Sequence, residues 1–345
     1  MLTVTTWLAL PAFAVALGLS RLLSSGRFGP AVLDRPGERS LHDRPMPRTG
    51  GLALWAGLVA TVPFVLVATG VPPGFFFLAG GAVLVGGFSL WDDLRPLSQL
   101  FRFFAQVAAA LLLNIGGFAF TGLSIPALGW LPLGVMGQLV TLMGIVWLTN
   151  LYNFMDGMDG FAGGIGAWGF FCLAVLGWME GHDAFAQLAI LIAAANFGFL
   201  WLNFPPARIF LGDVGSIPMG FLVAGFALWG VRDGIFPLWV PGLIFSPFVV
   251  DATITVARRA LRREKVWLAH RTHYYQRLVL LGWGHRKTVL AEYLLMMGTG
   301  GSALGLHRFG NDALSLVVLI AWASVYIGLA VLIGRLERQP RASAP

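Results

Sequence analysis

Apolar runs of about 20 residues alternate along the chain with short polar stretches that hold most of the charged side chains. A helix needs about 20 apolar residues to cross a bilayer. The pattern predicts an all-α polytopic membrane protein with ten or eleven transmembrane helices. The eleven predicted spans are residues 3–22, 50–70, 73–91, 101–120, 132–151, 161–180, 184–203, 214–231, 236–257, 287–306 and 312–334.

The composition supports this fold class. The chain is 57% hydrophobic and 11% charged, whereas soluble domains are about 25% charged. The single cysteine, Cys172, lies inside an apolar run, which excludes a disulfide framework and a cysteine-based metal site. No basic residue precedes the first apolar stretch, and no small-residue cleavage site leads into a soluble domain, so we expect a retained span rather than a signal peptide.

Basic residues fall in alternate loops. If the N-terminus lies outside, 21 of the 23 lysines and arginines lie on one face, and only Arg232 and Arg308 lie on the other. Positive residues mark the cytoplasmic side. We therefore expect an external N-terminus and a cytoplasmic C-terminus. The net charge of +7 then reflects membrane topology, and nucleic acid is not an expected partner.

This topology predicts a single integral-membrane domain, residues 1–334, followed by a disordered cytoplasmic tail, residues 335–345. The domain would present its polar loops on one cytoplasmic face, and lipid would surround its spans. The predicted cytoplasmic loops are residues 23–49, 92–101, 152–160, 204–213 and 258–286.

Acidic side chains gather on the same face. A lone aspartate at a helix end is often only solvated, but neighbouring carboxylates repel one another unless they share a cation or a proton. Magnesium fits best, because it prefers oxygen ligands and commonly binds one or two carboxylates together with substrate phosphates. Zinc is not expected, since the chain has neither a cysteine cluster nor a histidine pair at helical spacing. The five aspartates are Asp92, Asp93, Asp156, Asp159 and Asp213.

Two glycines and several arginines accompany these aspartates. Gly157 and Gly160 each follow an aspartate directly, and a missing side chain lets the backbone approach a ligand closely. The alternative is that small residues only allow membrane helices to pack. Arg48 and Arg102 lie at the starts of two spans. Most arginines at such positions only anchor spans to anionic lipids, but carboxylates, a metal and arginines together are the components of phosphoryl transfer.

Five blocks occur in one order: "DRPGERSLHDRPMPRTGG", "WDDLRPL", "NLYNFMDGMDG", "GFLWLNFPPARIFLGDVGS" and "HRTHYYQRLVLLGWGHRK". Through them, about residues 34–290 resemble the polyprenyl-phosphate N-acetylhexosamine-1-phosphate transferases, which include enzymes that start O-antigen synthesis. The resemblance implies transfer of N-acetylhexosamine 1-phosphate from a UDP-sugar to undecaprenyl phosphate, with release of UMP. It further implies a multi-pass protein of the bacterial inner membrane, with its active site facing the cytoplasm, and it allows a homodimer.

The resemblance also assigns roles to individual residues. Asn153 and Asp213 match magnesium-binding positions, with manganese as an alternative ion. Asp92 and Asp93 match a paired acidic motif, in which Asp92 is the candidate base or phosphate-orienting group. The other candidates are Asp156 in the catalytic cleft, Asp159 against the uracil ring, Arg102 against the diphosphate, and Arg48, Gly157, Gly160, Arg271 and His273 in substrate binding.

One block departs from the family pattern. Many relatives carry clustered histidines in the last cytoplasmic loop, whereas this chain continues after His273 with Tyr274, Tyr275 and Gln276. This difference favours the O-antigen branch, which uses N-acetylglucosamine, N-acetylfucosamine or N-acetylquinovosamine. The alternative within the family is the phospho-N-acetylmuramoyl-pentapeptide transferase of peptidoglycan synthesis.

Three other protein classes fit the pattern less well. A transporter would place carboxylates near the middle of its spans, and the chain shows no convincing inverted repeat. An intramembrane aspartyl protease would need a Gly-x-Gly-Asp motif, but Phe210 replaces the first glycine before Leu211. A CDP-alcohol phosphotransferase would need further paired aspartates after Asp156, which are missing.

Overall fold

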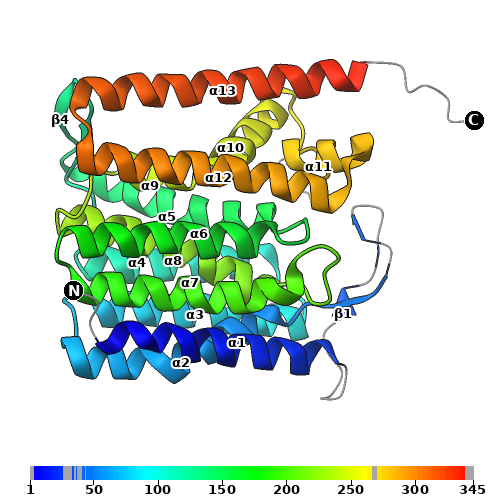
Figure 1. The fold of residues 1–345 in the computed structure, drawn as a ribbon, viewed down its shortest axis with the longest axis horizontal. Helices are drawn as coiled ribbons and strands as arrows, with labels where there is room; N and C mark the ends of the chain where they lie inside the picture. The colour runs from blue at the N-terminus through cyan, green and yellow to red at the C-terminus, as the bar shows by residue number, and fades with distance from the viewer. Residues whose placement is uncertain are drawn as a thin grey trace, which may run out of the picture.

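A computed structural model describes residues 4–25, 33–34, 36, 41–42, 44–265 and 270–338. Long helices run side by side along one direction and form a bundle (Figure 1). The helices are a 3-10 turn Val4–Leu8, α1 Ala9–Ser24, α2 Gly50–Thr69, α3 Phe75–Leu94, α4 Gln99–Ile115, α5 Val135–Met155, α6 Phe161–Met179, α7 Asp183–Asn203, α8 Asp213–Arg232, α9 Trp239–Ile244, α10 Ser246–Leu261, α11 Tyr274–Leu278, a π-helical turn Val279–Trp283, α12 Gly284–Phe309 and α13 Asp312–Arg338.

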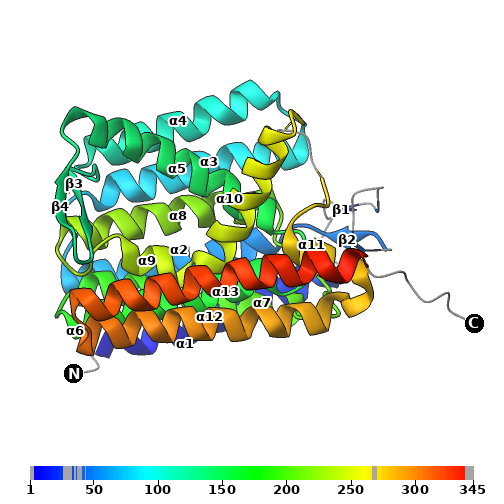
Figure 2. The ribbon, with the colours of Figure 1, turned by 90° about the horizontal axis from the view of Figure 1, so that it is seen from above.

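Within the described residues, nine helical segments are long and apolar enough to cross a membrane, which confirms a polytopic membrane protein. Two of the eleven predicted spans are not among the nine. The span predicted at 101–120 is the shorter helix α4, of 17 residues. The span predicted at 236–257 is divided into α9 and α10, and α10 is inclined to the other helices (Figure 2). Pro247 lies in the first turn of α10, where a residue without a backbone N–H is tolerated.

Two small antiparallel hairpins are exceptions to the predicted all-α class. Strands β1 (Leu33–Asp34) and β2 (Met46–Pro47) pair with each other, as do β3 (Gly122–Ile125) and β4 (Gly129–Pro132). The second hairpin is where Pro126 and Pro132 interrupt the apolar pattern, because proline is poorly tolerated inside a helix.

Helix α8 lies at the centre of the bundle and α13 lies at its edge. Almost every side chain of α8 is buried, and α8 packs against α3 and α5. Gly220 lets α5 approach closely, since a Cβ there would lie 2.5 Å from the carbonyl oxygen of Leu148. Most side chains of α13 are exposed, as expected for a helix that faces lipid. The central position of α8 gives Asp213, its first residue, a rigid support.

The two ends of the bundle differ. Strands β3 and β4 lie at one end, whereas β1, β2 and α11 lie at the other, which we call the cavity end (Figures 1 and 2). Helix α13 reaches the cavity end and continues to Arg338, so the predicted tail begins as helix over residues 335–338. The rest of that tail, residues 339–345, lies outside the described residues, as do parts of the predicted loops 23–49 and 258–286.

Candidate active site

A cavity of about 870 Å³ is lined by residues of the cavity end, and we call it the central cavity. Its lining comes from segments far apart in the sequence: the stretch before α2, the starts of α4 and α8, the end of α5 with the loop after it, and the segment around α11. Eight of the predicted site residues line it: Arg48, Arg102, Asn153, Asp156, Gly157, Asp159, Asp213 and His273.

Backbone hydrogen bonds join two of these segments. The N–H of Phe210 donates to the carbonyl of Pro47 at 2.7 Å, and the N–H of Gly50 donates to the carbonyl of Phe210 at 2.9 Å. Gly212, which precedes α8, has φ +73°, and a Cβ there would collide with the carbonyl oxygen of Arg48. A glycine is therefore required where the start of α8 meets the segment before α2.

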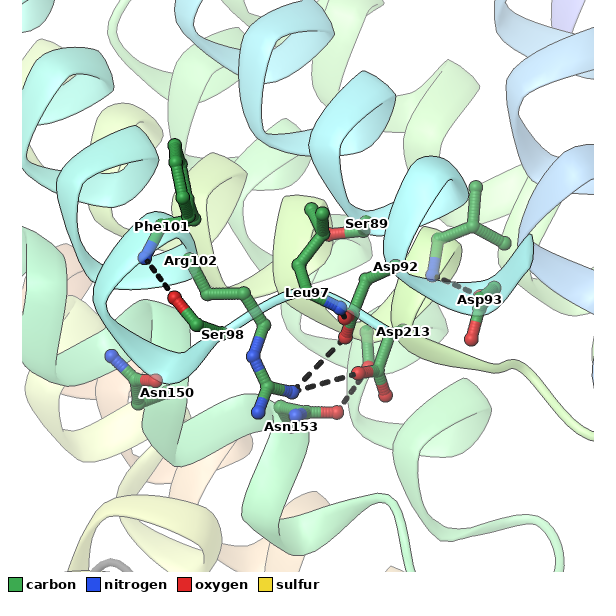
Figure 3. A network of polar contacts seen from close by, with 12 residues as sticks. Ser89, Asp92, Asp93, Leu97, Ser98, Phe101, Arg102, Asn150, Asn153 and Asp213 are labelled. Carbon is green, nitrogen blue, oxygen red and sulfur yellow. Dashed lines mark hydrogen bonds and ion pairs between the residues drawn. The ribbon is translucent and has the colours of Figure 1, made fainter. Parts of the chain in front are cut away.

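Asp93 fixes the start of α8 from a distance. Its buried carboxylate accepts a hydrogen bond from the N–H of Val214 at 3.2 Å (Figure 3). Arg48 Nη2 lies 3.4 Å from the other carboxylate oxygen. Gly212 precedes α8 and has no side chain that could cap the helix. Asp93 caps it instead. The N–H of Val214 is therefore not available to a phosphate at this helix start.

Asp92 holds the turn that carries Arg102. One carboxylate oxygen of Asp92 accepts from the N–H of Leu97 at 2.6 Å, and the other lies 3.0 Å from Arg102 Nη1. The same Nη1 lies 3.9 Å from Asp213 Oδ2 (Figure 3). Arg102 therefore lies between two carboxylates, and one of them, that of Asp213, lines the central cavity.

Asn153 and Asp213 have the chemistry of a magnesium site. The hydroxyl of Ser216 donates to Asn153 Oδ1 at 2.7 Å, which orients the amide oxygen and leaves it a second lone pair. Among the described residues, no three histidine, cysteine or acidic side chains form a metal cluster. Magnesium fits such a sparse site, since it binds through one or two protein oxygens and takes substrate phosphates and water as its other ligands.

Asp156 is a further carboxyl group close to Asp213. Burial, and then the carboxylates of Asp213 and Asp34, raise the pKa of Asp156 well above its usual range. Carboxylates that raise each other's pKa favour a bound cation. The clustered carboxyl groups, in addition to the oxygen ligands of Asn153 and Asp213, therefore favour a divalent ion in the cavity.

Asp159 lies in the loop between α5 and α6. Its carboxylate accepts from the N–H of Ala207 at 3.0 Å and lies 3.0 Å from Nδ1 of His285. Gly160 has φ +76°, donates its N–H to Asn203 and is buried. Gly160 therefore shapes the turn before α6 and does not line the cavity, unlike Gly157.

Residues 270–277 form one wall of the cavity, and Asp251 of α10 anchors it. The carboxylate of Asp251 accepts from the N–H groups of Tyr274 and Tyr275 at 2.9 and 3.1 Å. It also lies 3.3 Å from Nδ1 of His273, whose side chain is buried. His273 and Gln276 form a capping box at the start of α11.

Four predicted site residues lie outside the cavity lining. Asp92 and Asp93 act through Arg102 and α8, and Gly160 acts through its turn. Arg271 lines a separate groove on the other side of the wall.

Several lining residues were not predicted. The side-chain amides of Gln106 and Asn150 bond to each other across α4 and α5, at 2.6 and 3.2 Å. Gln106 lies one helical turn after Arg102, and Asn150 lies three residues before Asn153, so polar residues at helical spacing were the signal. His270 and His285 also line the cavity, and both lie within the last sequence block.

Comparisons with known proteins agree with this geometry. The profile of glycosyl transferase family 4 matches residues 75–231. Decaprenyl-phosphate N-acetylglucosaminephosphotransferase of Mycobacterium tuberculosis is 32% identical over 94% of this chain and 86% of its own length. A probable undecaprenyl-phosphate N-acetylglucosaminyl 1-phosphate transferase of Bacillus subtilis is 30% identical over 76% and 74%. The phospho-N-acetylmuramoyl-pentapeptide-transferase of Staphylococcus carnosus is 25% identical over 87% and 99%. The chain therefore belongs to glycosyl transferase family 4, the family that its five sequence blocks indicate.

Proposed function

We propose that this protein transfers N-acetylhexosamine 1-phosphate from a UDP-sugar to undecaprenyl phosphate and releases UMP. The observation that carries the proposal is the meeting of Asn153, Asp213 and Arg102 in one cavity at the end of a membrane bundle. A water-soluble diphosphate and a membrane-embedded lipid phosphate can meet only at such a boundary. The relatives named above support a polyprenyl phosphate acceptor and an N-acetylglucosamine donor.

In the proposed reaction, an oxygen of undecaprenyl phosphate attacks the phosphorus that carries the sugar. A new phosphorus–oxygen bond forms, and the bond from that phosphorus to the bridging oxygen breaks, so UMP leaves with the electron pair. An ionised lipid phosphate needs little help from a base. Asp92 therefore serves mainly to hold Arg102 against the donor diphosphate.

Asn153 and Asp213 would hold magnesium, or manganese in its place. A bound divalent ion neutralises charge on the diphosphate and on the leaving UMP. Asp156 contributes negative charge beside that ion, and Asp159, with His285, faces the uracil ring. Arg48, Gly157 and His273 contact the substrates from the remaining walls.

We further propose that the cavity faces the cytoplasm of a bacterium and that the product starts an O-antigen or another surface polysaccharide. The bias of basic residues toward one side of the membrane supports this orientation. The same reaction with a muramoyl-pentapeptide donor is the second candidate, since the relative from Staphylococcus carnosus bears that name. The wall argues against it, because Tyr274, Tyr275 and Gln276 follow His273 where that branch clusters histidines.

The test is exchange of radioactive UMP into UDP-N-acetylglucosamine by the purified full-length protein. We expect exchange only when undecaprenyl phosphate and magnesium are both present, and chelation should abolish it until the ion is restored. Exchange without undecaprenyl phosphate, or full exchange with the Asp213→Asn variant, would contradict the proposal. A panel of UDP-N-acetylhexosamines, with the muramoyl-pentapeptide donor included, then identifies the sugar.

A further inference from the structure

A second polar region lies beside the central cavity, between α10, α11 and α13. It is a groove of about 1040 Å³, which we call the basic groove. Six arginines and one glutamate line it, and no other charged side chain of the described residues does. The arginines come from the end of α10, from the segment around α11 and from the last turn of α13.

The basic groove has a large excess of positive charge. Its glutamate, Glu337, is already bound by Arg277 through two contacts of 2.6 and 2.5 Å. The other five arginines thus have no carboxylate of the groove left to neutralise them. In addition, Nε of Arg258 is buried and has no hydrogen-bond acceptor among the described residues. A ligand with negatively charged oxygens would neutralise these arginines.

The groove also has an apolar side. Leu280 and Leu281 of the π-helical turn and Val331 of α13 line it together with the arginines. Helix α13 is largely exposed along its apolar length, which places these side chains at the lipid boundary. A small soluble anion would leave this apolar side unused, whereas a phospholipid would cover it with its acyl chains.

A wall separates the groove from the central cavity. His270, His273 and Gln276 line the cavity, whereas Arg271, Tyr274 and Arg277 line the groove. Tyr274 stabilises the groove side, because the guanidinium groups of Arg277 and Arg258 lie 4.6 and 5.4 Å from its ring centre. The two pockets therefore face away from each other across one short segment.

We propose that the basic groove binds an anionic phospholipid of the surrounding bilayer. The headgroup phosphate lies among the arginines of α10, α11 and α13, and the acyl chains follow Leu280 and Val331. Arg271, on this reading, contacts the phospholipid and not the nucleotide sugar. The inference needs only the membrane location of the bundle and does not depend on the proposed transfer reaction.

The experiment is native mass spectrometry of the purified full-length protein with phosphatidylglycerol or phosphatidylcholine at equal concentration. The test variant is Arg262→Gln with Arg335→Gln, two exposed side chains of the groove. The matched control is Arg21→Gln with Arg95→Gln, two exposed arginines outside the groove at the same end of the bundle. We expect the wild type and the control to retain phosphatidylglycerol in preference to phosphatidylcholine, and the test variant to bind it about tenfold more weakly.

Three results would overturn the proposal. An equal loss in the control variant would mean that phosphatidylglycerol responds to general surface charge. Full retention by the test variant would mean that it binds elsewhere. Displacement by inorganic phosphate, or a preference for undecaprenyl phosphate at equal concentration, would mean that the groove is not a phospholipid site. Thermal unfolding of each variant confirms that the comparison is made on folded protein.

Discussion

The central cavity and the basic groove share a wall but differ in their balance of charge. The cavity lining carries both signs of charge: Arg48 and Arg102 lie there with Asp156, Asp159 and Asp213. Asp92 and Asp93 contact the two arginines from outside the lining. The groove has six arginines, and its one glutamate is already bound. Mixed charge suits a ligand that brings both a metal ion and phosphates, whereas charge of one sign suits an anion alone.

The two sides of the wall differ in the same way. On the cavity side, burial and then the nearby charges of His273 and Arg259 lower the pKa of His270 to about 4, so this histidine is neutral at neutral pH. On the groove side, the same segment presents the guanidinium groups of Arg271 and Arg277. One segment of eight residues thus presents neutral imidazole to one pocket and guanidinium to the other. This difference shows that adjacent residues of one segment can line separate pockets with different chemistry.

The largest expected effect comes from Asp213→Asn. Loss of this carboxylate should lower the transfer rate by about a thousandfold, because it removes a charged ligand for magnesium. Retention of phosphatidylglycerol should not change. Asp312→Asn, an exposed aspartate at the start of α13, is the matched control for the transfer assay. If Asp213→Asn also loses the phospholipid, the two pockets are not separate sites.

The second prediction distinguishes the role of Arg102 from the role of Asp92, which holds Arg102 in place. Arg102→Ala should lower kcat/KM by about a hundredfold, mainly by raising KM for the UDP-sugar. Asp92→Asn should cause a smaller loss, of about tenfold, because Arg102 stays but loses the contact at 3.0 Å. The double variant should be no worse than Arg102→Ala. Additive losses would instead give Asp92 a direct role in the reaction.

These contrasts show which parts of the molecule were predictable. Apolar runs are local, so the spans that became α2, α3, α6, α7 and α8 followed from the sequence. The break between α9 and α10 was missed, although Pro241 and Pro247 marked it, because the run around them is continuously apolar. The resemblance to the family, and no local pattern, predicted that Asn153 and Asp213 belong to one site, and both line the central cavity.

The features that could not be predicted are contacts between residues far apart in the sequence. Asp93 caps a helix that begins 120 residues later in the chain, and no local sequence pattern predicts such a contact. Gln106 and Asn150 pair across two helices whose relative rotation the sequence does not define. Arg271 is next to His270 in the sequence, so only the path of the backbone separates the groove from the cavity.

The third prediction tests the shared wall. Asp251→Asn should lower the transfer rate by about tenfold and also weaken retention of phosphatidylglycerol, since both pockets depend on α11. The amide cannot replace a carboxylate that accepts from Tyr274, Tyr275 and Thr255. The Tm should fall by roughly 5–10 °C. Asp183→Asn, at the start of α7, is the matched control. Loss of transfer with unchanged lipid retention would show that the groove does not need this anchor.

The smallest expected effect concerns pH. In the folded protein the pKa of His270 is about 4, while its ordinary value is 6.5, so between these values only the unfolded chain takes up the proton. The free energy of unfolding should therefore decrease as the pH falls from 6.5 toward 4. His270 is half-buried, beside Thr272, His273, Arg259 and Glu264, so solvent reduces the effect and we expect the Tm to fall by only about 2–4 °C between pH 7.5 and pH 5. His270→Gln should remove that part of the decrease. An identical decrease in the variant would mean that folding does not lower the pKa of His270, and the contrast between the two faces would then be wrong.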